Sequence, residues 1–208
     1  MSGVFEVQHP LIDCHLTRLR DARTPSPEFR GYVRRLATLL AYEATKDLVC
    51  DAERVTTPLT ETDGARLAER VGMVPILRAG LGMVDPVLDL IPTAEVWHLG
   101  LYRDEATAQP VEYYSKLPPG RPVDVALVTD PMLATGGSVI AACEALRAWG
   151  VSRVKVLSIL AAQAGIDTLA AAFPEAQVYV CRIDPTLNDD KFIVPGLGDA
   201  GDRIFNTP

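Results

Sequence analysis

The sequence is poor in the features that mark secreted and membrane proteins. Its 208 residues include four cysteines, and none has Cys-x-x-Cys spacing, so neither a disulfide framework nor a zinc site is predicted. No apolar run approaches the ~18 residues that a membrane-spanning helix needs. The opening "MSGVFEVQHP" also lacks the pattern of a secretory signal. We therefore expect reduced thiols, no membrane partner and a cytoplasmic location.

A surplus of positive charge is missing as well. Lys and Arg number 20 against 27 Asp and Glu, which gives a formal net charge of −7, and the basic residues form no block. This balance argues against binding nucleic acid through its phosphate backbone. Aromatic residues make up only 6% of the chain, whereas 48% of it is hydrophobic. This length and composition predict one domain over residues 1–208.

Apolar runs alternate along the chain with segments of helical periodicity. Residues 26–48 form the clearest predicted helix, with Ser26 in the capping position, Pro27 in the first turn and an apolar stripe. That stripe consists of Phe29, Val33, Leu36, Leu40 and Ala44. Strands are predicted within 72–80, 94–103, 125–130, 154–160 and 176–183, and further helices within 81–91, 139–150 and 166–172. The alternation predicts an α/β fold, with a mainly parallel sheet flanked by helices.

The most informative stretch follows the apolar run 125–129. Asp130 ends that run, and "PMLATGGS" then leads into a predicted helix. Ligands of open parallel sheets bind beyond the carboxyl ends of strands, and helix N-termini attract anions. Gly136 and Gly137 let the backbone wrap around a phosphate, to which Thr135 and Ser138 can add hydroxyl donors. An ionised Asp130 accepts hydrogen bonds from sugar hydroxyls, so the stretch fits a phosphorylated ribose.

Two common phosphate-binding motifs do not fit this loop. It lacks the lysine of a Walker loop and the Gly-x-Gly-x-x-Gly spacing of a dinucleotide fingerprint. A plain helix-capping loop, with glycines that serve only a tight turn, is the structural alternative. The preceding strand, Asp130 and Thr135 favour a phosphate cradle over that alternative.

The stretch "VTDPMLATGGS" resembles the phosphoribosyl-pyrophosphate motif of type I phosphoribosyltransferases. Its form is that of the uracil phosphoribosyltransferase family, because Pro131 stands where the wider superfamily has a second acid. Similar stretches cover essentially the whole chain: "HPLIDCHLTRLRD", "LLAYEATKDL", "VPILRAGLGM", "LGLYRDEATAQPVEYYSKLP" and "FIVPGLGDAGDRIFNT". One departure is Phe192, where the family commonly has tyrosine.

The resemblance implies an activity and its partners. A member of this family transfers the phosphoribosyl group of 5-phosphoribosyl 1-diphosphate (PRPP) to uracil, which gives UMP and pyrophosphate for pyrimidine salvage. Mg²⁺ is the implied cofactor, and we expect it to come with the diphosphate because no carboxylate cage is visible in the sequence. A homodimer or a dimer of dimers is implied, and GTP is a candidate activator.

The resemblance also assigns site residues. Those implied to bind PRPP are Arg78, Arg103, Asp130, Pro131, Met132, Leu133, Ala134, Thr135, Gly136, Gly137, Ser138 and Asp199. Those implied to contact uracil are Ile193, Gly198, Asp199 and Ala200, mainly through the main chain. The implied catalytic residues are Arg78, Arg103, Asp130 and Asp199, with the two arginines stabilising charge on the leaving pyrophosphate.

Three of these segments also have structural alternatives. Arg78 interrupts an apolar strand end before "AGLG", which fits either an ion pair at the surface or a loop whose Gly80 and Gly82 let a ligand approach. Residues 102–117 predict a hairpin arm, either exposed with a solvated Arg103 or closing over the donor and excluding water. The irregular tail 184–208 is either a flexible end or, as Ile193 and Val194 before a proline favour, a segment that binds the base.

The sequence leaves two rival functions to consider beside transfer to uracil. A phosphoribosyltransferase that uses a purine or orotate is one rival, and the uracil-type tail argues against it. A nucleotide-sensing regulator that binds RNA is another, and the acidic balance argues against it. His9, His15 and His98 do not cluster, so structural roles are expected for them, and Trp97 and Trp149 are expected to serve packing.

Overall fold

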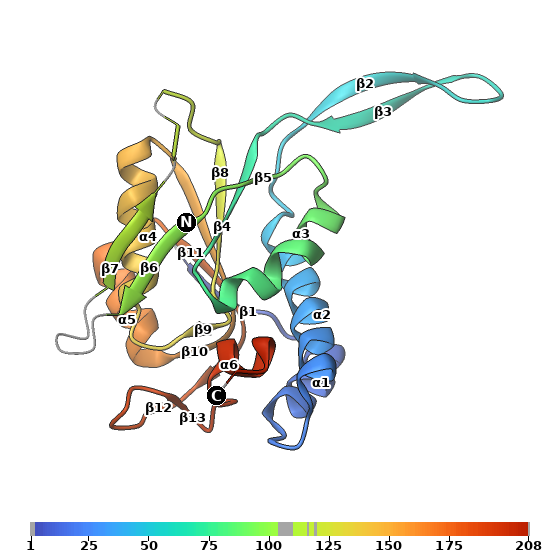
Figure 1. Cartoon of the computed structure of the whole chain (residues 1–208). Helices are drawn as coiled ribbons and strands as arrows, with labels where there is room; N and C mark the ends of the chain where they lie inside the picture. Colours follow the sequence, from blue (N-terminus) through green and yellow to red (C-terminus); the bar gives the residue numbers. More distant parts are fainter. Residues whose placement is uncertain (1–2, 104–109, 116, 119, 208) are drawn as a thin grey trace.

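The computed structural model describes residues 3–103, 110–115, 117–118 and 120–207, with side chains outside 101–116. A twisted parallel sheet forms its centre (Figure 1). The strand order is β1 (Gly3–Glu6), β11 (Gln177–Asp184), β10 (Arg153–Ala162), β8 (Val125–Thr129), β4 (Val71–Pro75) and β5 (Glu95–Val96), and β9 (Met132–Leu133) also pairs with β10. The described pairs in this sheet are parallel, which confirms the predicted fold class.

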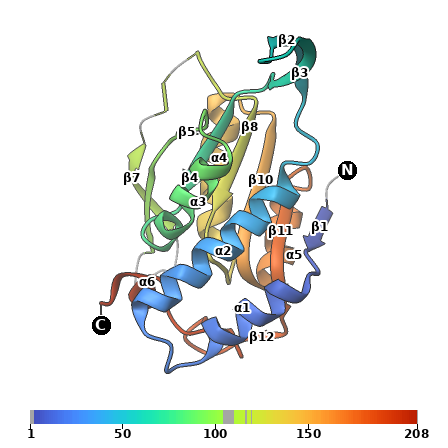
Figure 2. The ribbon, with the colours of Figure 1, turned by 90° about the vertical axis from the view of Figure 1, so that its right-hand side faces the viewer.

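Helices cover both faces of the sheet (Figures 1 and 2). One face carries α1 (Pro10–Arg20), α2 (Ser26–Ala44) and α3 (Val84–Leu90), with the short 3-10 turn η1 (Ala79–Met83) before α3. The other face carries α4 (Gly137–Trp149) and α5 (Gln163–Ala172). Each face buries its own apolar cluster, so strands β8 and β10 are covered on both sides, as their continuous apolar sequence predicted.

Helix α2 confirms its predicted stripe and its predicted start at Ser26, but not its predicted end or its predicted cap. All five stripe residues are buried, whereas the helix ends at Ala44 and not at residue 48. The Thr45 hydroxyl donates to the Ala41 carbonyl at 2.7 Å and so satisfies one of the last carbonyls. Pro25 takes the N-cap position without a side-chain hydrogen bond, so the prediction that Ser26 caps the helix is wrong. The Ser26 hydroxyl instead bonds the Asn206 side chain at 3.1 Å.

Two hairpins leave the sheet. The hairpin of β2 (Cys50–Thr56) and β3 (Glu61–Leu67) projects far from the body (Figure 1), and its sequence predicted no strand because nearly every side chain is exposed. The predicted strand 94–103 is split into β5 and β6 (Leu99–Arg103), and β6 pairs with β7 (Pro110–Ser115). This second hairpin begins three residues before the predicted arm 102–117 and overlaps it, and residues 104–109 and 116 of the arm are outside the described part.

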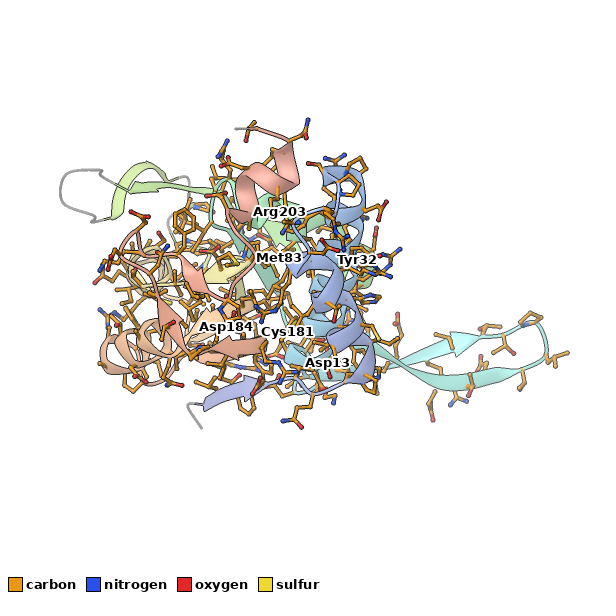
Figure 3. All side chains as sticks on the ribbon, turned by 90° about the horizontal axis from the view of Figure 1, so that it is seen from below. Asp13, Tyr32, Met83, Cys181, Asp184 and Arg203 are labelled. Atoms are coloured by element: carbon orange, nitrogen blue, oxygen red, sulfur yellow. The ribbon has the colours of Figure 1, made fainter. Side chains whose placement is uncertain are left out.

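The tail is folded against the body. Strands β12 (Thr186–Leu187) and β13 (Ile193–Val194) pair, and the short helix α6 (Ala200–Phe205) follows. Figure 3 labels Asp184 and Arg203, which hold the two ends of this segment. Buried Asp184 accepts the Gly196 amide at 2.9 Å, and the Arg203 guanidinium donates to the Asp21 carbonyl at 2.7 Å. The sequence did not predict α6, because six residues are too few for a clear helical period.

Candidate substrate site

The candidate site lies at the carboxyl edge of the sheet, where several predicted segments meet. Arg78 follows β4, Asp130 follows β8, and the tail follows β11. Because these strands run parallel, their ends lie along one edge (Figure 1). The site is thus assembled from loops that are distant in sequence but adjacent in the sheet.

The loop 130–138 forms a hollow of about 120 Å³ at the start of α4. Gly136 is the N-cap with a φ of +87°, a left-handed conformation that favours glycine, and its carbonyl accepts the Ile140 amide at 2.9 Å. The amides of the first turn have no partner within the helix, so they are available for an anion. Residues that line the hollow are Asp130, Met132, Leu133, Ala134, Thr135, Gly136, Gly137, Ser138 and Val139.

Gly165, at the start of α5, supports this loop and was missed by the sequence analysis. A Cβ on Gly165 would lie 2.3 Å from the Ala134 carbonyl oxygen, and one on Gly136 would lie 2.9 Å from the Gly165 carbonyl. The two backbones therefore touch directly. No local pattern could have revealed this contact, because a single glycine in a helix has no periodicity of its own.

Asp130 is the first of the residues that line the hollow. Its Oδ1 accepts the Met132 amide at 3.2 Å, and its own amide donates to the Leu157 carbonyl at 3.2 Å. Burial raises the pKa of Asp130 to about 7; the Met132 hydrogen bond lowers it, and the charge of Asp199 raises it. The structure thus brings Asp130 and Asp199 into one site. An added proton would remove acceptor capacity from Asp130 near neutral pH.

The sequence left two roles open for Arg78, a surface ion pair or contact with a ligand. The structure shows an ion pair between Arg78 and Asp202. Arg78 Nη2 lies 2.8 Å from Asp202 Oδ1, yet 59% of the Arg78 side chain is exposed, so a ligand can still reach it. Gly80 and Gly82, which the sequence predicted to let a ligand approach, also lie close to neighbouring groups of the protein. A Cβ on Gly80 would lie 2.3 Å from the Thr129 carbonyl, and one on Gly82 would lie 3.1 Å from the Ile204 side chain. Both glycines allow the loop to pack on its neighbours.

The predicted base-binding residues lie in the ordered tail. Asp199 caps α6, where its side chain accepts the Asp202 amide at 2.9 Å. The side chains of Ile193 and Ala200 are buried, and Gly198 has a φ of +81°. Because those side chains pack into the core, main-chain atoms are what these positions offer to a ligand. The side chain of Arg103, the remaining predicted site residue, lies outside the described residues.

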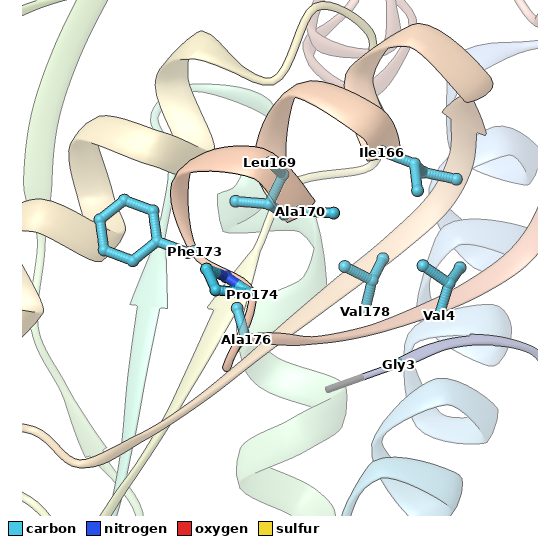
Figure 4. A pocket seen from close by; sticks show the side chains of 9 residues that line it. All are labelled: Gly3, Val4, Ile166, Leu169, Ala170, Phe173, Pro174, Ala176 and Val178. Carbon is cyan, nitrogen blue, oxygen red and sulfur yellow. The ribbon is translucent and has the colours of Figure 1, made fainter. Parts of the chain in front are cut away.

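A separate cavity of about 170 Å³ lies between α5, β1 and β11 (Figure 4). Its lining is apolar, with Ile166, Leu169, Phe173 and Val178 among the residues. Such a lining offers nothing to a phosphate or a sugar, so the loops at the carboxyl edge remain the candidate site.

In the described part of the chain, no helix has the length and apolar character to cross a membrane.

Comparisons with known proteins agree with this geometry. A family model described as uracil phosphoribosyltransferase matches residues 6–207. The chain belongs to the uracil phosphoribosyltransferase family. It is 58% identical over 207 residues to a uracil phosphoribosyltransferase from Roseiflexus sp. (strain RS-1), with 100% of both chains covered. It is 49% identical over 208 residues to one from Symbiobacterium thermophilum, again with 100% of both covered. The resemblance inferred from the motifs is confirmed.

Solved structures share this fold. A protein from Aquifex aeolicus superposes with a TM-score of 0.92 at 35% identity, covering 98% of each chain. A hypoxanthine phosphoribosyltransferase from Trypanosoma cruzi superposes with a TM-score of 0.50 at 10% identity, covering 76% of this chain and 75% of that one. The second likeness shows a shared fold only.

Proposed function

We propose that this protein transfers the 5-phosphoribosyl group from PRPP to uracil, which gives UMP and pyrophosphate in pyrimidine salvage. The observation that carries the proposal is Asp130 beside a hollow lined with the amides of the α4 N-terminus. This pairing suits the two chemical parts of a phosphoribosyl group, because the amides bind the phosphate and the carboxylate accepts from the ribose hydroxyls. Membership of the family supports the same assignment.

The roles divide along the substrate. Residues Leu133 to Ser138 hold the 5′-phosphate, and Asp130 and Asp199 orient the ribose. A ring nitrogen of uracil forms a bond to the anomeric carbon while the bond from that carbon to the pyrophosphate oxygen breaks, and the proton of the ring nitrogen is released to solvent. Negative charge builds on the leaving group, and Arg78, together with Arg103, stabilises it. Pro131 and Met132 complete the backbone between the sugar and phosphate contacts.

The base is read by the main chain of Ile193, Gly198 and Ala200. Uracil presents an acceptor, a donor and an acceptor along O4, N3–H and O2, which a backbone can match with N–H, C=O and N–H. Cytosine reverses two of these groups, so it would leave buried polar groups without partners. A site of this kind rejects the wrong pattern by about 10⁴ to 10⁵.

Mg²⁺ is the proposed cofactor. Among the described residues, no three or more His, Cys, Asp and Glu side chains gather into a metal cage. The site fits an ion carried by the diphosphate, because Mg²⁺ binds substrate phosphates with one or two carboxylates and keeps several waters. Asp130 and Asp199, of which the second raises the pKa of the first through its charge, are the carboxylates proposed to contact such a complex through water. When bound, Mg²⁺ neutralises charge on the diphosphate.

We further propose a cytoplasmic homodimer or dimer of dimers. The β2–β3 hairpin supports this assembly, because an isolated two-stranded hairpin with exposed side chains is only marginally stable in water. Sedimentation equilibrium gives the mass directly, and a monomer at micromolar concentration would contradict the assembly.

Activation by GTP is tested by titrating GTP into the assay, with ATP as the control nucleotide.

A nucleobase panel tests the function. Purified protein, PRPP and Mg²⁺ are incubated with uracil, 5-fluorouracil, cytosine, hypoxanthine or orotate, and nucleotide formation is measured by chromatography. We expect UMP from uracil, product from 5-fluorouracil, and at most traces from the other bases. Comparable rates with hypoxanthine or orotate would support the rival transferases. Retention of RNA on a filter without formation of UMP would support the regulatory alternative.

A further inference from the structure

Three side chains link the loop after β4 to the end of the chain. Arg78 donates to Asp202 Oδ1 at 2.8 Å and to the Thr207 hydroxyl at 3.4 Å. The Thr207 hydroxyl in turn donates to the same Asp202 oxygen at 2.9 Å, which closes a ring of three contacts. Arg78 and Asp202 are 124 residues apart in sequence, so this link joins two separate segments of the candidate site.

We propose that Asp202 is a positioning residue, which orients Arg78 for the diphosphate and couples the base-binding segment to the diphosphate loop. The inference rests on the proposed function, because it assumes that Arg78 binds PRPP. It assigns a role to a residue that the sequence analysis did not place in the site.

The contacts are better suited to orientation than to stability. The side chains of Arg78 and Asp202 are 59% and 31% exposed, and ion pairs this open contribute about 0–1 kcal/mol to folding. An unrestrained arginine, however, loses rotamer entropy when it binds a ligand. Contacts that restrict Arg78 beforehand lower this cost, which is the effect of preorganisation. Arginine has five N–H donors, so two contacts leave others for a phosphate.

The position of Asp202 explains the proposed coupling. It lies in the first turn of α6, and its amide bonds the side chain of Asp199, the N-cap of that helix. A Cβ on Gly201 would lie 3.2 Å from Asp199 Oδ1 and 3.6 Å from Arg78 Nη2, so the three residues are packed together. Any shift of the segment that contacts the base therefore moves the partner of Arg78.

Steady-state kinetics of Asp202→Ala provide the first test. We expect the KM for PRPP to rise about tenfold, because a hydrogen bond to a charged group is lost, while the KM for uracil changes less than twofold. Asp202→Asn keeps an oxygen that accepts from the guanidinium, so an intermediate KM is expected. Asp89→Ala is the matched control, because Asp89 pairs with Arg34 at 3.3 Å on an exposed surface and should leave both constants unchanged.

A double-mutant cycle separates positioning from a general loss of structure. PRPP affinity is measured by calorimetry for Arg78→Ala, Asp202→Ala and the double variant, and thermal melting shows that each is folded. If Asp202 acts through Arg78, the second substitution has little further effect once Arg78 is absent. Wild-type PRPP affinity in Asp202→Ala, or an equal loss with and without Arg78, would overturn the inference while leaving the proposed function intact. A wild-type protein that neither binds PRPP nor forms UMP would contradict both.

Discussion

The guanidinium of Arg20 donates two hydrogen bonds, of 2.7 and 2.8 Å, to the carboxylate of Asp184, the last residue of β11. The same arginine donates to the Gly196 carbonyl at 2.9 Å, while Asp184 accepts the Gly196 amide. The Asp184 side chain is 4% exposed and the Arg20 side chain is 25% exposed, so the carboxylate is shielded from water while the guanidinium is partly exposed. The pair fixes the segment that carries Ile193 and Gly198.

Arg20→Ala should therefore damage both stability and base binding. Removing Arg20 leaves the buried Asp184 carboxylate without its cationic partner, although the Gly196 amide still donates to it, and this costs about 1–3 kcal/mol. We expect a lower melting temperature and a KM for uracil that rises more than the KM for PRPP, because this pair holds the tail at Gly196. Arg23→Ala is a suitable control, since Arg23 is 90% exposed in its pair with Asp21. Equal changes in the two KM values would argue against a specific role in the tail.

Asp130→Asn should raise the stability of the protein above pH 7 and weaken its binding of PRPP. Because the pKa of Asp130 is raised from 3.8 to about 7, the folded protein resists its ionisation, and the free energy of unfolding falls as pH rises between those values. The asparagine variant escapes this loss, so above pH 7 it should melt at a higher temperature than the wild type. The measurement is a series of thermal melts from pH 5 to pH 9.

The same substitution should alter the pH dependence of PRPP affinity. In the wild type, affinity should improve as pH rises through about 7, because the ionised carboxylate accepts from the ribose hydroxyls. The variant should bind more weakly and retain only the titration of the ligand's own phosphate, near pH 6. Identical pH profiles for both proteins would show that Asp130 does not titrate in this range.

Gly165→Ala should displace the loop 130–138, the proposed phosphate-binding loop. The added methyl would meet the Ala134 carbonyl at 2.3 Å, and relief of that overlap requires the loop 130–138 to move. We expect PRPP affinity to fall by at least about tenfold and stability to fall by about 1–3 kcal/mol. Gly31→Ala in α2 is the matched control, because its nearest neighbour would be 3.6 Å away and helical alanine is favoured by about 0.5–1 kcal/mol. Unchanged PRPP binding in Gly165→Ala would contradict the packing argument.

Trp149→Phe should weaken the attachment of α4 to Pro118, which follows β7 in the chain. The Trp149 indole donates to the Pro118 carbonyl at 2.6 Å and packs edge-on against Trp97, with ring centroids 5.6 Å apart. Loss of this hydrogen bond should cost about 1 kcal/mol, or roughly 2–4 °C in melting temperature. Trp97→Phe makes the same chemical change where the indole N–H has no partner among the described residues, so a smaller cost is expected. Equal losses for both variants would exclude a specific effect of the Pro118 contact.

The sequence by itself determined the features that local pattern controls. Apolar runs predicted β8 and β10, and the apolar stripe within residues 26–48 predicted the buried face of α2. Residues 130–138 predicted a phosphate-binding loop. Each of these depends on neighbours within a few residues, where periodicity and backbone preference act directly. Family membership followed from the motifs for the same reason, because their residues are contiguous.

Only the tertiary structure decided which of these segments meet. Arg20 and Asp184 are 164 residues apart, and Arg78 and Asp202 are 124 apart, so no local period relates their side chains. The Gly165–Ala134 contact and the exposed β2–β3 hairpin likewise depend on strand order and on how loops pack at one edge of the sheet. Chain crossovers set these pairings, and the crossovers are determined by burial of the whole sheet on both faces.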